Sequence, residues 1–209
     1  MRKIFVIIWF NILFFQMYSM SNKVDILREM GEALCVDTGN KTYKKMFFDA
    51  FPTSFGTFKN VFSWQRDSLT GHSLPPPIEN SAKFIDLFFS LSHSIDIDSF
   101  CNKTIHICLD GRWEIGFVSG FQFMLLNFAL KDYLYKGQIK NHPLWRNLNK
   151  YSDEEIRSFW HFYLDYAEWI DRELYIKTKT KLTKITLHKY PRLKRILNQE
   201  YKRMLVLQP

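Results

Sequence analysis

The stretch SDEEIRSFWHFYLDYAEWI, residues 152–170, decides the fold of this chain. Its first residues match a capping box, in which the Ser152 hydroxyl accepts a hydrogen bond from the N3 amide and the Glu155 carboxylate reaches back to the capping residue. Apolar residues then recur at three- and four-residue spacing, which is the period of one face of an α-helix. They are Ile156, Phe159, Trp160, Tyr163, Leu164, Ala167 and Ile170. The sequence therefore predicts a long helix here, with one face in the core.

An aromatic stripe, made of Phe162, Tyr166 and Trp169, follows the flank of the same predicted helix. A helix with a single buried face does not need a second apolar stripe. Because large apolar stripes are uncommon on the surface of soluble monomers, either the C-terminal segment covers this stripe or a partner binds it. We favour covering by the C-terminal segment, and we keep the three residues as candidate partner contacts.

A polar set, His161, Asp165 and Glu168, lies on the face opposite the core at a spacing that makes helical side chains neighbours. Such a set could hold a metal ion or supply an acid–base pair, which is the basis of an alternative interpretation as a hydrolase. Ion pairs at this spacing are routine on solvated helix faces, and we favour that interpretation. Nucleotide-binding glycine loops and the motifs of zinc proteases and serine hydrolases are absent from the sequence. We therefore predict no catalytic residue, no metal site and no cofactor.

The cysteines form an odd set of three, Cys35, Cys101 and Cys108. If Cys101 and Cys108 share a helix, their seven-residue spacing separates them by roughly 10 Å along its axis. That separation is beyond the reach of a disulfide bond. Two possibilities remain open: one bridge from Cys35 to either of the others, or buried free thiols.

Periodic segments elsewhere in the chain predict further helices. Residues 24–34 and 43–50 repeat apolar residues at helical spacing. Two more helices are expected to follow a cap at Thr53 or Ser54 and a cap at Asn80 or Ser81. The segment 99–109 is ambiguous, because its isoleucines and leucine alternate as in a strand although the segment as a whole could be helical. We favour a helix there.

Residues 113–130 are apolar nearly all round, which is typical of a helix buried on every side. The apolar length is short for a membrane span. Gly116 and Gly120 lie one turn apart and would let another helix approach closely. With residues 63–80 as the longest loop, the sequence predicts an all-α fold: a compact single-domain bundle of about seven helices around this buried central helix.

Residues 1–21 have the pattern of a Sec-type signal peptide. Arg2 and Lys3 form a positively charged start, and residues 4–15 form an apolar run. Small residues at the −3 and −1 positions place the cleavage site after Ser21. The apolar run is shorter than the ~18 residues of a membrane anchor, although a retained anchor stays open as an alternative. We therefore predict an exported protein, periplasmic or secreted.

Charge divides the rest of the chain into a helical domain, residues 22–175, and a basic C-terminal segment, residues 176–209. Residues 174–209 carry ten Lys and Arg against one acid, whereas residues 22–173 carry 17 basic and 20 acidic residues. The body of the protein is thus mildly acidic and its end is strongly basic. The first part of the basic segment could be extended or weakly helical.

An amphipathic helix is predicted to begin at Pro191, a residue favoured at helix starts. We expect its apolar face to pack on the domain. Its opposite face supplies the candidate partner contacts Arg192, Lys194, Arg195, Lys202 and Arg203. An acidic protein, an anionic membrane surface or a nucleic acid could each use such a face, and a merely solvated face is equally open. Export makes nucleic acid the least favoured target, and we predict none.

Aromatic residues recur through residues 45–165. They occur in FFDAFP (47–52) with Phe55 and Phe58, and at Trp113, Phe121-Gln122, Leu144-Trp145 and SDEEIRSFWHFYLD (152–165). In this pattern the chain resembles small exported all-helical proteins of Bacteroidetes, some of which resemble immunity proteins against toxins of type VI secretion. The resemblance implies protein binding rather than catalysis, and it supplies no functional residues.

We therefore predict an exported, non-enzymatic protein-binding protein, in particular an immunity protein that neutralises an interbacterial toxin. A periplasmic hydrolase that uses the polar set and a protein that contacts a membrane surface through the last helix are the alternatives. The sequence leaves the oligomeric state open.

Overall fold

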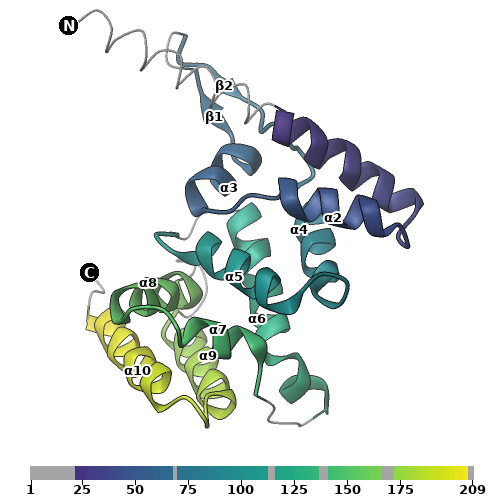
Figure 1. The fold of residues 1–209 in the computed structure, drawn as a ribbon. Coiled ribbons are helices and arrows are strands. Elements are labelled where there is room, and N and C mark those ends of the chain that lie inside the picture. Colours follow the sequence, from purple (N-terminus) through teal and green to yellow (C-terminus); the bar gives the residue numbers. More distant parts are fainter. Residues whose placement is uncertain (1–21, 68–69, 113–115, 137–140, 166–171, 207–209) are drawn as a thin grey trace, which may run out of the picture.

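The computed structural model of the protein is mostly helical (Figure 1). It describes residues 22–67, 70–112, 116–136, 141–165 and 172–206. These residues form ten α-helices, one short 3-10 helix and one two-stranded hairpin, so the predicted all-α class is confirmed. The predicted signal peptide, residues 1–21, lies outside the described residues.

The elements follow one another with short connections. In chain order they are a first helix over residues 22–36, α2 (Lys41–Ala50), α3 (Phe55–Phe62), β1 (Gln65–Arg66), β2 (Ser73–Leu74), α4 (Ser81–Ser90), the 3-10 helix η1 (Leu91–His93), α5 (Ile97–Cys108), α6 (Phe117–Lys136), α7 (Pro143–Leu148), α8 (Asp153–Leu164), α9 (Arg172–Thr186) and α10 (Pro191–Val206). The two strands pair antiparallel, with Gln65 opposite Leu74.

Side-chain caps explain where six of these helices begin. A polar side chain before each helix accepts a hydrogen bond from a first-turn amide, which would otherwise have no partner. The capping residues are Asn40, Ser54, Asn80, Asp96, His142 and Ser152. The predicted capping box is confirmed, because the Ser152 amide donates to Glu155 Oε2 at 2.8 Å and the Glu155 amide donates to Ser152 Oγ at 3.2 Å.

Two groups of helices lie at opposite ends of the molecule (Figure 1). The first helix, α2, α3 and α4 form one end, and α8, α9 and α10 form the other, with α5, α6 and α7 between them. Helix α4 packs along α6, α5 packs against α7 and α8, and α10 packs against both α8 and α9. The basic C-terminal helix is therefore held on the surface of α8 and α9.

Phenylalanine rings fill the core of the first group. Phe88 of α4 stacks on Phe51 with ring centroids 4.1 Å apart and on Phe100 of α5 at 4.8 Å. Phe58 of α3 meets Phe121 of α6 edge to face at 5.0 Å. These rings are fully buried and need no hydrogen-bond partners, so burial of apolar area holds this end together.

Larger aromatic residues with polar tips join the second group. Trp145 of α7 contacts Trp160 of α8 with ring centroids 5.5 Å apart. The Trp145 Nε1 donates to the Thr186 hydroxyl of α9 at 3.1 Å, and the hydroxyls of Tyr163 and Thr183 lie 3.1 Å apart. Helices α7, α8 and α9 thus share one core, in which the tips of Trp145 and Tyr163 are hydrogen-bonded, whereas Trp160 Nε1 has no hydrogen-bond partner among the described residues.

Helix α8 is shorter than the sequence predicted, because it ends at Leu164 and not at residue 170. Asp165 leaves the helical conformation with φ −65° and ψ 141°. Gln122 of α6 supplies a reason: its Nε2 donates to the carbonyls of Phe162 at 2.6 Å and Asp165 at 3.0 Å. These bonds satisfy carbonyls that a continued helix would satisfy with its own amides. The helix end is therefore set by a residue about 40 positions away.

Helix α6 is not buried on every side, contrary to the prediction for residues 113–130. Phe121 and Leu125 are fully buried, but Phe123 is 63 % exposed. The arrangement of about seven helices around a central helix is accordingly not confirmed.

The segments that the sequence left open are helical. Residues 99–109 fall almost wholly within α5, as favoured. Helix α9 runs unbroken from Arg172 to Thr186, across the predicted boundary between the domain and its C-terminal segment. The predicted loop 63–80 contains the β1–β2 hairpin.

Replacing Gly111 with alanine should destabilise the fold. A Cβ at this position would lie 2.5 Å from Cδ2 of Phe162, which is fully buried and has no room to move away. We expect a loss of about 1–3 kcal/mol in the free energy of unfolding, measured by urea denaturation.

Gly56→Ala is the matched control, because nothing lies within 4 Å of a Cβ there. Alanine inside α3 should stabilise the protein by about 0.5 kcal/mol. Equal effects of the two substitutions would contradict the packing of Phe162 against Gly111.

Candidate functional site

The solvent side of α10 carries a row of polar and basic side chains that we call the α10 face. It consists of Lys194, Arg195, Asn198, Gln199 and Lys202, which with Pro191 line a shallow groove of about 410 Å³. Their spacing of three and four residues puts them on one stripe of the helix. The α10 face is thus a continuous cationic and amide surface.

The apolar side of α10 is buried. Leu193, Ile196 and Leu197 are fully buried, and Met204 is 1 % exposed, in the packing against α8 and α9. The predicted amphipathic helix is present, but its apolar face is not available to enter a membrane. Its basic face is the surface that remains for recognition.

Asp153, in the first turn of α8, fixes the start of α10. Its carboxylate accepts hydrogen bonds from Arg192 Nε at 2.8 Å and from Arg195 Nη2 at 2.9 Å. Arg192 also donates to the carbonyls of Asn149 at 2.9 Å and Tyr151 at 2.8 Å. The hydrogen bonds from Arg195 and Arg192 hold the pKa of Asp153 below its ordinary value.

Glu200, the one acid of the basic segment, fixes the end of α10 to α8. Its side chain is fully buried, accepts from Arg203 Nη2 at 2.7 Å and lies 2.9 Å from His161 Nδ1. Burial by itself raises the pKa of Glu200, but the hydrogen bonds from His161 and Arg203 outweigh it, and the pKa lies below the ordinary value. A buried carboxylate with such partners is a structural anchor.

These anchors divide the predicted partner-binding cations. Arg192, Arg195 and Arg203 form ion pairs within the molecule. Lys194 and Lys202 are exposed, and no acidic group among the described residues lies within 4.0 Å of either ammonium. Of the five predicted contacts on α10, Lys194 and Lys202 are therefore the two without an ion pair in the described part of the chain.

The predicted aromatic contact Phe162 is not on this surface. Phe162 is fully buried, with its ring 5.9 Å from that of Phe55, so its prediction as a partner contact is wrong. The Phe162 ring faces Phe55 of α3 and Phe121 of α6 instead of solvent. Tyr166 and Trp169 lie outside the described residues.

The polar set of the hydrolase interpretation is not assembled among the described residues. His161 pairs with Glu200, Asp165 is the residue that ends α8, and Glu168 lies outside the described residues. No cluster of three or more metal-ligating side chains occurs in the part of the chain that the structure describes.

The cysteines are free thiols, which excludes the bridge from Cys35. Cys101 and Cys108 are buried in α5, and Cys108 Sγ donates to the Thr104 carbonyl at 3.1 Å. Burial raises the pKa of Cys101 to about 12 and that of Cys108 well above its ordinary value. Because the thiolate is the reactive form, neither thiol is activated at neutral pH.

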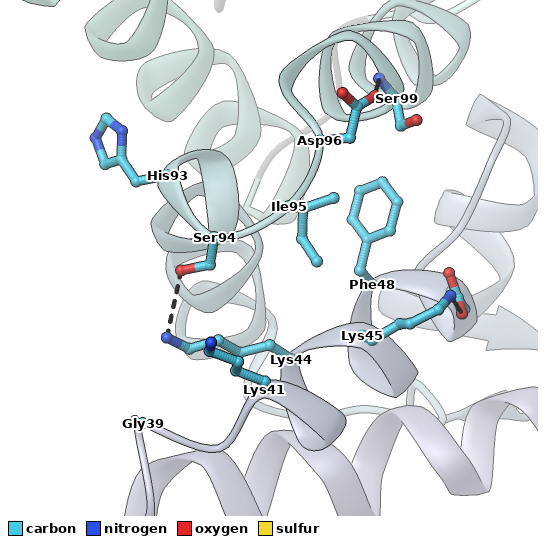
Figure 2. A pocket seen from close by; sticks show the side chains of 11 residues that line it. Gly39, Lys41, Lys44, Lys45, Phe48, His93, Ser94, Ile95, Asp96 and Ser99 are labelled. Carbon is cyan, nitrogen blue, oxygen red and sulfur yellow. Dashed lines mark hydrogen bonds and ion pairs between the residues drawn. The ribbon is translucent and has the colours of Figure 1, made fainter.

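A basic cleft that the sequence analysis missed lies between α2, η1 and the start of α5 (Figure 2). It measures about 700 Å³ and includes Lys41, Lys44 and Lys45. Lys44 Nζ donates to Ser94 Oγ at 3.3 Å beside Lys41 (Figure 2), and Lys45 pairs with Asp49 at 2.6 Å. The sequence NKTYKK shows the lysines, but only the fold brings η1 opposite them.

Lys179 of α9 is a further residue that the sequence analysis missed. It is 2 % exposed, and its ammonium contacts neutral groups: it donates to the Tyr175 hydroxyl at 3.0 Å and lies 4.3 Å from the centre of the Tyr163 ring. Burial lowers the pKa of Lys179 to about 7. The amine sits in the core without an entrance in the described clefts, so we treat it as structural.

Comparison with known proteins adds no relative: no family model matches the chain, and no curated protein or solved structure is similar to it. Among the described helices, none has the length and hydropathy that a membrane span requires.

Replacing Lys179 with methionine should change how stability depends on pH. With a pKa of about 7 in the folded protein and an ordinary pKa of 10.5, the unfolded chain binds more protons between these values. Stability from this residue therefore rises with pH above 7. From pH 7 to 8.5, the wild type should gain roughly 2 kcal/mol relative to Lys179→Met, measured by urea denaturation at each pH.

Lys177→Met is the control, because Lys177 is exposed on the same helix. It should keep the pH dependence of the wild type. Parallel stability curves for wild type and Lys179→Met would show that Lys179 is charged in the fold.

Proposed function

We propose that this chain is an exported, non-enzymatic protein-binding protein whose α10 face contacts an acidic surface of its partner. The observation that carries the proposal is the pair Lys194 and Lys202, two exposed cations without an acidic group within 4.0 Å among the described residues. Both lysines lie on α10, and the opposite side of α10 packs against α8. A rigid face loses little conformational freedom on binding, which favours recognition.

The charge distribution supports an acidic partner. The body of the chain is mildly acidic and the last 36 residues carry ten basic residues against one acid. That acid, Glu200, is buried and already paired, so it does not offset the α10 face. Complementary charge speeds association and selects among partners.

Two features support binding over the alternatives. His161 is engaged with Glu200, which is a structural use of a residue that the hydrolase alternative requires. The apolar side of α10 is buried, which removes the insertion surface that the membrane alternative requires. The particular role that we propose is that of an immunity protein which occludes an interbacterial toxin, from the likeness of residues 45–165 to such proteins.

Reversing the charge of Lys194 and Lys202 together should weaken partner binding. In Lys194→Glu/Lys202→Glu, attraction to an acidic surface becomes repulsion, and the partner affinity should fall by about tenfold or more. Affinity capture from periplasmic extracts of the source cells, followed by biolayer interferometry with the recovered protein, measures the change. Both side chains are exposed, so the melting temperature should stay near that of the wild type.

Lys41→Glu/Lys83→Glu is the control with the same change in net charge. Both residues lie in the first turns of α2 and α4, where a glutamate is favoured by the helix dipole, and these helices lie at the other end of the molecule (Figure 1). The control should bind like the wild type. If both double variants lost affinity equally, net charge alone would explain the loss. If both bound the partner as tightly as the wild type does, the proposed role of the α10 face would be wrong.

The immunity role predicts protection of cells. Bacteria that produce the captured partner in their periplasm should survive only when this chain is produced with it. Lys194→Glu/Lys202→Glu should lower the number of survivors by about tenfold or more, in step with its affinity. Survival that is independent of this chain would leave protein binding in place and exclude immunity.

Export predicts a processed N-terminus. Mass spectrometry of the protein from the periplasm of its source cells should find Asn22 as the first residue, because the small residues at 19 and 21 define the cleavage site. Intact chains beginning at Met1 in the membrane fraction would show a retained anchor. Intact chains in the cytoplasm would contradict export.

A further inference from the structure

Another cleft, separate from the α10 face, lies between α4, η1 and α6. It extends to His142, the residue that caps α7. It measures about 660 Å³, a size in the range of small-molecule sites. Its apolar lining comes from Phe89, Met124 and Phe128. The rings of Phe89 and Phe128 lie 6.1 Å apart, and Phe128 meets the His142 ring edge to face at 4.7 Å. The floor is therefore a set of rings fixed by the phenylalanine core.

Three nitrogen-bearing side chains, His93, Lys131 and His142, also line this cleft. Lys131 Nζ lies 3.4 Å from His93 Nε2, and within the described residues this is the contact recorded for the ammonium. An ammonium has three protons to donate, so it can bond an anion as well. His142 Nδ1 accepts the Leu144 amide at 3.2 Å, which places the proton of the neutral ring on Nε2. The Lys131 ammonium therefore supplies a positive charge to a largely apolar cleft.

One acid, Asp86, also lines the cleft. In the described part of the structure it forms no ion pair with Lys131 within 4.0 Å. Met124 and Lys131, which also line the cleft, are two turns apart on α6, or roughly 10 Å. The cleft is therefore long enough for an alkyl chain that ends at the cation.

We propose that this cleft binds a small amphipathic carboxylate, with its apolar chain on Phe89, Met124 and Phe128 and its carboxylate on Lys131. Apolar burial supplies the affinity, and the charge-assisted hydrogen bond from the lysine fixes the orientation. This site is independent of partner binding by α10.

Isothermal titration calorimetry with octanoate tests the proposal, with octylammonium and octanol as probes that share the chain. Octanoate should bind about tenfold or more tightly than either, because only its head group is complementary to Lys131. Equal affinity for the three probes would show non-specific apolar adsorption and would overturn the proposal.

Two variants and one control test whether octanoate binds in this cleft. Lys131→Met keeps the apolar stem and removes the charge, and it should weaken octanoate by about tenfold while octanol is unchanged. Ser90→Trp adds a ring at an exposed position on the cleft wall and should reduce binding of all three probes. Lys181→Met, at an exposed site on α9, should bind octanoate like the wild type. Unchanged octanoate affinity in Lys131→Met, or an equal loss in Lys181→Met, would overturn the assignment, provided that melting curves show each variant folded.

Discussion

The contact between Trp145 and Trp160 is the interaction on which the C-terminal half of the structure depends. Trp145 belongs to α7, which packs on α5 and so on the phenylalanine core. Trp160 belongs to α8, against which α10 packs. Each indole is fully buried, and the pair connects the end of the molecule that is held by phenyl rings to the end that presents the basic helix. The position of the α10 face therefore depends on the Trp145–Trp160 contact, which lies between α7 and α8 and not in α10 itself.

Much of the fold was predictable because it is encoded locally. The capping box at Ser152 and the apolar spacing that follows it involve residues within one or two turns of each other, and both appear in α8. The end of α8 was not predictable, because Gln122 provides the hydrogen bonds that replace the next turn. Phe162, kept as a candidate partner contact, is a core residue because its ring packs against Phe55 of α3 and against Gly111.

In the candidate site, too, the local features were predictable from the sequence and the contacts between distant residues were not. The sequence identified the cations of α10, but it could not tell which of them were already engaged, because Asp153 pairs with arginines about 40 residues away. The cleft at Lys131 was missed for a related reason: His93 and Lys131 are 38 positions apart and neither belongs to a motif. Ion pairs and clefts are made by packing between helices, and periodicity describes only one helix at a time.

Helix α9 is held in the molecule in a different manner from the helices of the first group. Its buried side carries Lys179, Thr180 and Thr183, and the Thr180 hydroxyl has no hydrogen-bond partner among the described residues. Burial of this polar face contributes less to the free energy of folding than burial of the phenyl rings around Phe88. Local opening should therefore begin at α9, and the amides there should exchange with solvent deuterium before those of α4 and α5. Because α10 packs partly on α9, the rigidity of the α10 face is limited by the least apolar helix beneath it.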